Sequence, residues 1–309
     1  MMRFAVESWS PEYGVAADPT DLEDARGEVD VAVERRPQDW TPITVAAGAA
    51  MSVVFVDGVR RVDARVWIVD GEMVRPGVCA SVAAGAVHCE GSTATVIEPR
   101  VSRGLFAAAS SGAGPIVTRH GAYGFVPCAG DDAEALYLGI HEEMTSLEKG
   151  LPIVGTADCV VYDGPLRGRN DPSGVGFVKT QAVQYLPDEL QPVLARLGAG
   201  DRTPLFLIGG GGGFTRWSWY LRLPGPVSQP LSAIVRCELA GAGTAADAIE
   251  RADAVSGVLP RFASEPHKDA RAPQNLYPIA GLEHELRRRL GDQHLLERAL
   301  RVAAAGVSA

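Results

Sequence analysis

The sequence predicts an α/β protein in which helices pack on a mixed sheet, and two patterns carry this prediction. Residues 53–56 and 159–162 are short apolar runs, rich in β-branched and aromatic residues and without helical spacing, which is typical of buried strands. Apolar residues at 136, 140, 144 and 147 instead recur on one helical face. We expect an N-terminal arm or cover over residues 1–45 and a core domain over residues 46–309.

The first strand-rich block is predicted to form a three-stranded meander. We expect strands over residues 52–56 and 64–69 and a third strand between residues 74 and 88. Asp70-Gly71 is a typical hairpin turn and would join the second strand to the third. The first strand would therefore end at Asp57.

A helix and a second group of strands follow this block. Residues 110–130 hold many glycines and prolines and are predicted to form a loop. Asp131-Asp132 then opens a helix, because acids favour the first helical turn, and a strand ending at Asp163 comes next. The later predicted elements are strands over 174–178, 205–208, 217–223 and 233–239, and helices over 187–197, from Thr244 onward, over 277–290 and over 293–304.

The composition describes a globular protein and excludes several classes. Of 309 residues, 46% are hydrophobic and 22% are charged, which suffices for a sizeable core. A formal charge of −9 excludes a protein that coats nucleic acid through its overall charge. The five cysteines are widely spaced, so we expect reduced and mostly buried thiols. No stretch resembles a membrane span, and Glu7 comes too early for a signal peptide, so we expect a cytoplasmic protein.

Two Asp-Gly pairs that follow apolar runs are the strongest functional feature. Asp57-Gly58 follows the run at 53–56, and Asp163-Gly164 follows the run at 159–162. A carboxylate at the rim of an apolar core is costly unless it is paired or binds a metal ion. Neighbouring strands lie about 4.8 Å apart, so Asp57 and Asp163 could share one Mn²⁺ or Mg²⁺ ion. Taken singly, either pair is more often an ordinary turn.

A third acid is needed to complete a metal site, and the preceding helix offers three. Glu148 is the first choice, because it lies four residues after Met144 and near the apolar face of that helix. Glu143 is the second choice and Glu142 is the remaining alternative. Taken alone, Glu148 is more often a surface acid near the C-terminal end of the helix.

Basic residues accompany both aspartates. Arg60 follows the first pair, Arg167 and Arg169 follow the second, and Lys179 closes the next predicted strand. Cations beside metal-binding acids suit a polyanionic substrate such as a phosphate backbone, and we expect Lys179 to contact a phosphate. Charge balance for the two aspartates explains the same residues equally well.

Seven short motifs occur along the chain in a fixed order, at residues 55–58, 162–167, 175–180, 219–223, 271–279, 282–283 and 290–292. Each motif is unspecific alone, but their order and spacing resemble the NurA-domain nucleases, particularly the bacterial members of that family. The resemblance spans about residues 50–292.

The resemblance implies an RNase H-like fold and a homodimer that hydrolyses DNA with Mn²⁺, as a 5′–3′ exonuclease that also has endonuclease activity. It also implies a hexameric HerA-type ATPase as partner in DNA end processing and repair. The family's two strand aspartates correspond to Asp57 and Asp163, and its helical glutamate corresponds to Glu148. Its late tyrosine corresponds to Tyr277, and His284 lies near its late histidine.

Two other functions remain open at this stage. The chain could be a catalytically inactive nuclease-like subunit that binds and regulates a motor ATPase, which the acidic net charge favours. It could also hydrolyse a small phosphorylated molecule, in which case a narrow closed pocket would lie over Asp57. The distance between the carboxylates of Asp57 and Asp163 is the observation that bears most directly on the choice.

Overall fold

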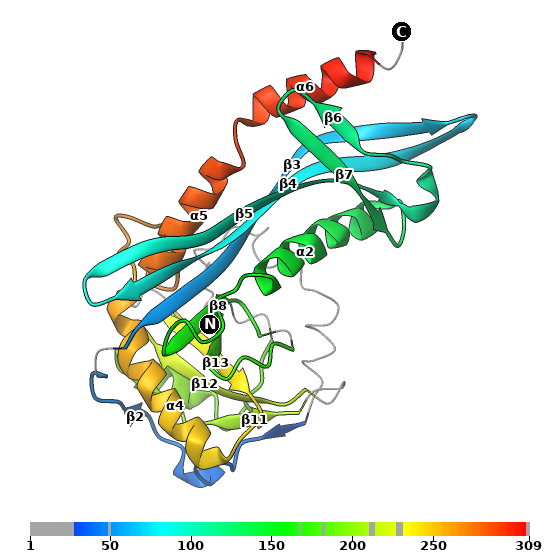
Figure 1. Cartoon of the computed structure of the whole chain (residues 1–309). Helices are drawn as coiled ribbons and strands as arrows, with labels where there is room; N and C mark the ends of the chain where they lie inside the picture. The colour runs from blue at the N-terminus through cyan, green and yellow to red at the C-terminus, as the bar shows by residue number, and fades with distance from the viewer. Residues whose placement is uncertain are drawn as a thin grey trace, which may run out of the picture. The chain divides into compact units, whose positions relative to one another are not determined.

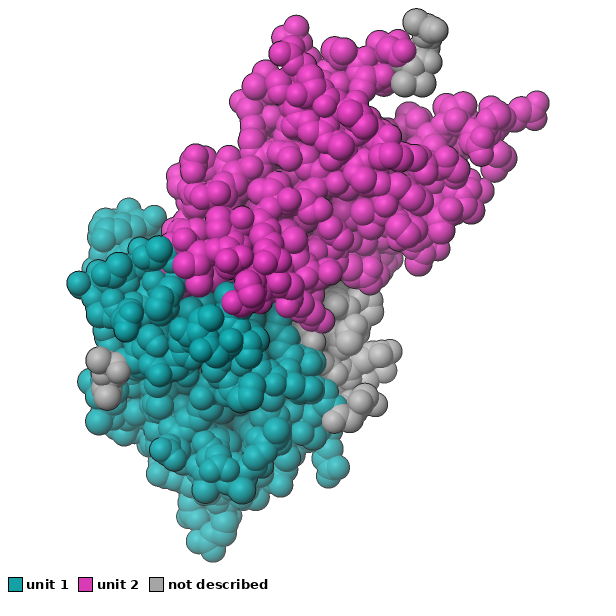
Figure 2. Space-filling view, viewed as in Figure 1, with its two compact units in different colours: residues 1–55, 88–95, 153–280 teal, residues 56–87, 96–152, 281–309 magenta. Residues whose placement is uncertain are grey.

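The chain divides into two compact units in the computed structural model. Unit 1 comprises residues 1–55, 88–95 and 153–280, and unit 2 comprises residues 56–87, 96–152 and 281–309 (Figure 2). The structure describes residues 28–48, 51–166, 168–180, 183–209, 214–226 and 231–306.

Three long strands provide most of the sheet of unit 2. β3 spans Val53–Asp70, β4 spans Met73–Glu90 and β5 spans Thr93–Ala108, and they are neighbours in that order (Figure 1). Tight turns join them at Gly71 and Gly91, whose φ angles of 59° and 58° are readily adopted only by glycine. The predicted hairpin turn at Asp70-Gly71 is confirmed.

The strand that contains Asp57 does not end there. The sequence predicted separate strands over residues 52–56 and 64–69, but β3 runs unbroken from Val53 to Asp70. The prediction of a strand end at Asp57-Gly58 is therefore wrong. The ladder formed with a neighbouring long strand outweighs the local turn preference of an Asp-Gly pair. Asp57 consequently stands inside a strand.

The predicted loop over residues 110–130 contains two further strands. β6 spans Ile116–Thr118 and β7 spans Gly121–Cys128; they pair antiparallel, and β7 also runs parallel to β5. The loop prediction is wrong here because proline does not exclude a strand at every position. Pro127 lies beyond the part of β7 that pairs with β6, so its missing N–H costs nothing on that side.

Two helices cover opposite faces of the unit 2 sheet. α2 spans Ala133–Lys149, begins at the predicted Asp132, whose side chain accepts from the Ala135 N–H at 2.8 Å, and packs its predicted apolar face on β4, β5 and β7. α6 spans Gln293–Gly306 and packs Leu300 against Cys79. Ala80, the next residue of β4, contributes to the α2 core, because successive strand residues point to opposite faces.

Unit 1 contains a mixed sheet whose strands run in the order β8-β9-β13-β12-β11-β1. β8 and β9 are parallel, and each later pair is antiparallel. The short strand β10 pairs with both β12 and β2. The bounds are Cys159–Asp163 for β8, Gly174–Val178 for β9, Ile234–Ala240 for β13, Arg216–Arg222 for β12, Phe206–Ile208 for β11, Val29–Asp30 for β1, Asp201–Arg202 for β10 and Ile43–Thr44 for β2. The predicted fold class, a mixed sheet with flanking helices, is confirmed.

Successive residues of β12 contribute to different layers of unit 1. Trp219 donates from Nε1 to the hydroxyl of Ser256 on α4, at 2.9 Å, and α4 spans Ala245–Val258. Tyr220 instead packs in a core with Trp40 and Leu194. Thr244 begins α4 with the predicted capping box. The helix predicted over residues 187–197 is shorter in the structure, where α3 covers only Pro192–Arg196.

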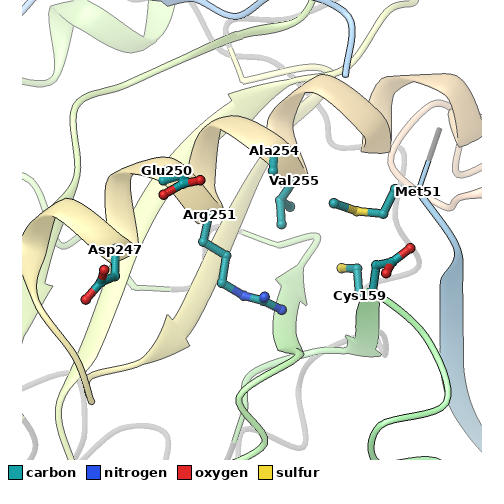
Figure 3. Close-up of a pocket in the computed structure, with 8 residues that line it drawn as sticks. Met51, Cys159, Asp247, Glu250, Arg251, Ala254 and Val255 are labelled. Atoms are coloured by element: carbon teal, nitrogen blue, oxygen red, sulfur yellow. The ribbon is translucent and has the colours of Figure 1, made fainter. Parts of the chain in front are cut away.

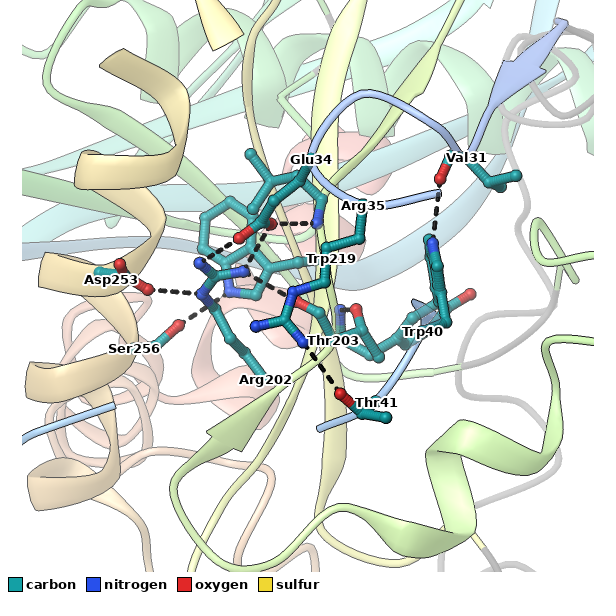
Figure 4. Close-up of polar contacts among 12 residues, drawn as sticks. Val31, Glu34, Arg35, Trp40, Thr41, Arg202, Thr203, Trp219, Asp253 and Ser256 are labelled. Carbon is teal, nitrogen blue, oxygen red and sulfur yellow. Dashed lines mark hydrogen bonds and ion pairs between the residues drawn. The ribbon is translucent and has the colours of Figure 1, made fainter. Parts of the chain in front are cut away.

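The described part of the N-terminal segment is anchored on unit 1 by one buried arginine (Figure 4). Arg202 is 1% exposed and donates from its two terminal nitrogens to Glu34 at 2.8 and 2.9 Å. Its Nε donates to Asp253 of α4 at 2.6 Å. Trp40 adds a hydrogen bond from Nε1 to the carbonyl of Val31 at 3.0 Å. The separate arm over residues 1–45 stays a prediction, and residues 1–27 lie outside the described residues.

The remaining elements are one α-helix and three short 3-10 helices. They are α5 over Tyr277–Arg289, η1 over Pro37–Asp39, η2 over Ala109–Ser111 and η3 over Leu259–Phe262. All five cysteines are free and buried, as predicted, and burial raises the pKa of Cys159 to about 12. Among the described residues, we find no helix with the length and apolar character that a membrane crossing requires.

Candidate active site

An ion pair joins the ends of the two parallel strands of unit 1. β8 ends at Asp163, and Lys179 directly follows the last residue of β9. Because parallel strands bring their carboxyl ends to one edge of a sheet, the two side chains meet there. Lys179 Nζ donates to Asp163 Oδ2 at 2.6 Å, and the two side chains are 2% and 13% exposed. The prediction that Lys179 closes the strand after the second Asp-Gly pair is confirmed.

A buried asparagine holds the other side of this lysine. Asn275 is fully buried and accepts from Lys179 Nζ through Oδ1 at 2.7 Å. Its amide Nδ2 donates to Asp269 Oδ2, also at 2.7 Å. Gln274 donates from Nε2 to the backbone carbonyl of the same lysine at 2.9 Å. The ammonium group of Lys179 is therefore held between the carboxylate of Asp163 and the carboxamide of Asn275.

Asp269 remains ionised at the far end of this chain of hydrogen bonds. Burial alone would raise the pKa of its carboxyl group, but hydrogen bonds from the Arg271 N–H and from Asn275, with the charge of Arg271, outweigh burial and lower that pKa. A charged Asp269 fixes the orientation of the Asn275 amide, because a carboxylate only accepts hydrogen bonds. Asn275 must then present its oxygen, not its nitrogen, to Lys179.

A buried glutamate holds the loop that follows Asp163. Glu238 of β13 is fully buried; its Oε1 accepts from the Leu166 N–H at 2.5 Å and its Oε2 from Arg236 at 2.7 Å. A Cβ at Gly176 would come within 2.6 Å of Glu238 Cγ, so glycine at that position makes room for the glutamate. The motifs at 162–167 and 175–180 are thus linked through one carboxylate.

Three acids come together near this lysine. Asp57, Asp163 and Glu283 each offer a carboxylate oxygen, and these oxygens all lie within 4.8 Å of one another. The N–H of Cys159 donates to the carbonyl of Ser52 at 3.2 Å, which sets β8 beside the start of β3. Asp57 lies on β3, two residues after Phe55, and Glu283 lies on α5, three residues after Ala280. Both β3 and α5 begin in unit 1. Each of the three acids therefore lies on an element that begins in unit 1.

The predicted third acid lies against the first Asp-Gly pair. A Cβ on Gly58 would come within 2.5 Å of Glu148 Oε1 and 2.8 Å of Met144 Cγ, so the glutamate packs directly on the backbone beside Asp57. Of the two alternatives on α2, Glu143 accepts a hydrogen bond from Ser102 at 2.9 Å and Glu142 is exposed. The geometry distinguishes Glu148 from both.

The predicted substrate-binding residues occupy separate positions. Arg60 contacts His141 of α2 at 2.7 Å, in unit 2. Arg169 lies over the ring of Tyr162, with 4.6 Å between its Cζ and the ring centre, and Arg167 lies outside the described residues. Tyr277 donates to Glu265 at 3.0 Å, and Lys268 lies over its ring. His284 is exposed on α5.

Sequence reasoning missed three residues of this region. Glu283, Asn275 and Asp269 were not assigned roles, although Asn275 and Glu283 lie within motifs that carry the family resemblance. Asn275 and Glu283 are eight residues apart, and this spacing does not match any motif that would have marked them as functional residues. Only the return of the chain to the end of β9 gives these residues a shared location.

The donor set fits a hard divalent cation. Carboxylate oxygens are the ligands that Mg²⁺ and Mn²⁺ prefer, and the three clustered acids provide them. Asp57 is 8% exposed, so a bound cation would offset the cost of keeping its charge out of water. The adjacent Lys179 forms an ion pair with Asp163 and offsets part of the negative charge of the cluster.

Comparison with one solved structure, that of a NurA nuclease, supports the fold. No protein-family model and no curated protein matches the sequence. The structure is similar to the NurA nuclease from Sulfolobus solfataricus, with a TM-score of 0.52, 10% identity, and coverage of 82% of this chain and 86% of that one. The catalytic domain of human endonuclease V matches with a TM-score of 0.34, 18% identity, and coverage of 91% and 99%. Endonuclease V from Bacillus subtilis matches with a TM-score of 0.33, 14% identity, and coverage of 86% and 86%.

The NurA comparison shows the fold alone, because 10% identity does not carry function from one chain to another. The chain thus has a fold similar to that of the NurA nuclease, and it carries an acidic cluster that could bind a divalent ion.

Proposed function

We propose that this protein is a metal-dependent DNA nuclease that hydrolyses phosphodiester bonds. The observation that carries the proposal is the group of three carboxylates formed by Asp57, Asp163 and Glu283, with oxygens within 4.8 Å of one another. The NurA-like fold supports the same reaction class by analogy. The sequence motifs that resemble that family include all three acids of the cluster, at residues 55–58, 162–167 and 282–283.

The three acids would hold Mn²⁺ or Mg²⁺, with Glu148 as a fourth carboxylate beside Asp57. When bound, such an ion lowers the pKa of a water molecule and stabilises negative charge on the phosphate oxygens. The chain's own residues fix the positions of these acids. β3 and β8 provide the two aspartates on rigid strands, and α5 provides Glu283.

Lys179 would contact a phosphate oxygen of the DNA strand. Its ammonium is 2% exposed and held by Asp163 and Asn275, so few rotamers are open to it. A preorganised cation of this kind stabilises developing negative charge without reorganising when the reaction occurs. Arg60, Arg167, Arg169 and Tyr277 are the other residues that we propose to contact the DNA strand.

The resemblance to NurA-domain nucleases extends the proposal to partners and context. We propose a homodimer that acts with a HerA-type hexameric ATPase in DNA end processing in the cytoplasm, as a 5′–3′ exonuclease with endonuclease activity. A net charge of −9 opposes tight binding to DNA by this chain alone. A translocating partner that delivers the DNA end would overcome that repulsion.

The test compares Mn²⁺-dependent cleavage of linear DNA by wild type, Asp57→Asn and Asp163→Asn, with and without the ATPase. We expect each substitution to lower the rate at least about 100-fold, because it removes a charged ligand from the metal site. Asp70→Asn is the matched control, because Asp70 is also a β3 residue followed by a glycine but lies exposed at the hairpin turn.

Two outcomes would remove the proposal. Equal cleavage by all variants means that the acid cluster does not take part, and absence of cleavage by wild type with its partner present means that the chain is not a nuclease. If calorimetry then detects no Mn²⁺ binding while the ATPase still binds, the chain is an inactive regulatory subunit.

A further inference from the structure

A cavity of about 290 Å³ lies beneath α4 in unit 1, apart from the acid cluster (Figure 3). The cavity is lined by apolar residues together with charged residues of α4 and of the segment before β8. The lining residues are Met51, Asp158, Cys159, Asp247, Glu250, Arg251, Ala254 and Val255. This volume is at the lower end of the range for ligand pockets and suits a small molecule or a terminal group.

One arginine in this cavity has no partner within the described part of the chain. Figure 3 shows Arg251 extending from α4 toward Cys159. Its Nε and Nη2 atoms are buried and make no hydrogen bond to any described residue. A buried N–H without an acceptor is costly, and native structures rarely retain one without an ion, a water molecule or a ligand to satisfy it.

The positions of the two nitrogen atoms indicate what would satisfy them. Nε and Nη2 lie along one edge of the planar guanidinium group, and their two N–H bonds run parallel. This edge matches two oxygens of a carboxylate or a phosphate group in a bidentate pair. Water molecules can also accept from these donors, but an oxyanion accepts from both in a bidentate pair in which donor and acceptor are both charged.

Three acids line the cavity, Asp158, Asp247 and Glu250, and they limit the charge of the ligand. Asp158 accepts from the backbone and hydroxyl of Ser52 at 2.9 and 2.8 Å, and these bonds lower the pKa of its carboxyl group. Asp247 accepts from the Thr244 hydroxyl at 2.7 Å, which lowers its pKa likewise. Both therefore stay ionised near neutral pH. Their negative charge disfavours a polyanion such as a DNA strand, but a group with a single carboxylate or phosphate remains compatible.

We propose that this cavity binds a small ligand through a terminal oxyanion, with Nε and Nη2 of Arg251 as the two donors and Met51, Cys159 and Val255 as apolar contacts. The proposal does not rest on the nuclease activity. It assigns a second site whose ligand carries a single carboxylate or a single phosphate group.

The test follows the Arg251 Nε–H resonance of the full-length ¹⁵N-labelled protein during titration with sodium acetate, sodium phosphate or sodium chloride. We expect a saturable shift with acetate or phosphate and none with chloride. The tighter of the two anions identifies the ligand as a carboxylate or as a phosphate. A shift that does not saturate, or that chloride reproduces, means a water-filled cavity and overturns the proposal.

Two variants separate binding from folding. Arg251→Lys keeps the charge but loses the parallel donors, so we expect about tenfold weaker binding, equivalent to one charge-assisted hydrogen bond. Arg251→Met should abolish the binding heat in calorimetry and leave the melting temperature unchanged or higher. Arg119→Met, at an exposed position, controls for the lost charge. Unchanged binding in Arg251→Lys, or a large drop in melting temperature with unchanged binding in Arg251→Met, would give the arginine a structural role instead.

Discussion

The two Asp-Gly pairs share a sequence but use their glycines for different physical reasons. Gly164 has a φ of 98° and nothing within 4 Å of its missing Cβ, so conformation requires glycine there, at the end of β8. Gly58 lies within β3, and its missing Cβ leaves space for Glu148 and Met144. One glycine turns the chain after its aspartate, and the other admits an acid beside its aspartate. An identical dipeptide therefore does not imply an identical position in a strand.

The largest expected effect is on Mn²⁺ binding and DNA cleavage, and it should differ between substitutions of Glu283 and of Glu148. Glu283→Gln should weaken Mn²⁺ binding and lower DNA cleavage about 100-fold, because Glu283 is one of the three clustered acids. Glu148→Gln should have a smaller effect on Mn²⁺ affinity, since Glu148 lies against Gly58 beside that group. Calorimetric titration with Mn²⁺ and cleavage rates measured on the same preparations check both. The reverse order would make Glu148 the principal ligand.

Alanine at each glycine tests the comparison directly. In Gly58→Ala the new methyl would come within 2.5 Å of Glu148 Oε1, so we expect a loss of about 1–3 kcal/mol in the free energy of unfolding and a loss of cleavage. Gly164→Ala meets no atom but adopts a strained φ, which costs about 1–2 kcal/mol. Urea unfolding and Mn²⁺ affinity, measured together, distinguish a displaced ligand from simple strain. Equal loss of Mn²⁺ affinity in both variants would contradict the distinction.

A smaller effect is expected from the residue that orients Lys179. Asn275→Leu removes the acceptor for the buried ammonium, so we expect roughly tenfold lower kcat with little change in KM, and a loss of about 1–3 kcal/mol in stability. The matched control is Gln274→Leu, which releases the backbone carbonyl of the same lysine. It should lower stability but leave kcat close to wild type. A parallel loss of kcat in both variants would show that only the fold is affected.

The smallest expected effect is the pH dependence that Asp269 contributes. Its pKa in the folded protein lies below the ordinary value of 3.8, so the folded state binds fewer protons than the unfolded state in that range. The stabilisation is present above pH 3.8 and is lost as the pH falls through the lowered pKa. Urea unfolding of wild type and Asp269→Asn at a series of acidic pH values should converge as the pH falls. A constant difference between them would exclude this linkage.

Patterns that depend on residues close in sequence were predictable from the sequence. Asp132 and Thr244 mark helix starts because a side-chain oxygen must satisfy nearby backbone N–H groups. The apolar face of α2 follows from helical spacing, and the strands that end at Asp163 and Val178 follow from short apolar runs. Asp57, Asp163 and Lys179 could be singled out for the same reason, since an acid or a base next to such a run stands out.

Contacts between distant parts of the chain were decided only by the tertiary structure. β3 continues through Asp57-Gly58, and β6 and β7 form in a segment rich in glycine and proline. In both cases hydrogen bonds to a neighbouring strand outweigh local preferences. Asn275 and Glu283 join the region of Asp163 only after the chain has folded back, and Arg251 becomes unpaired only once α4 packs over the cavity. Spacing along a sequence encodes local geometry, whereas a site assembled from remote segments depends on packing that no single segment specifies.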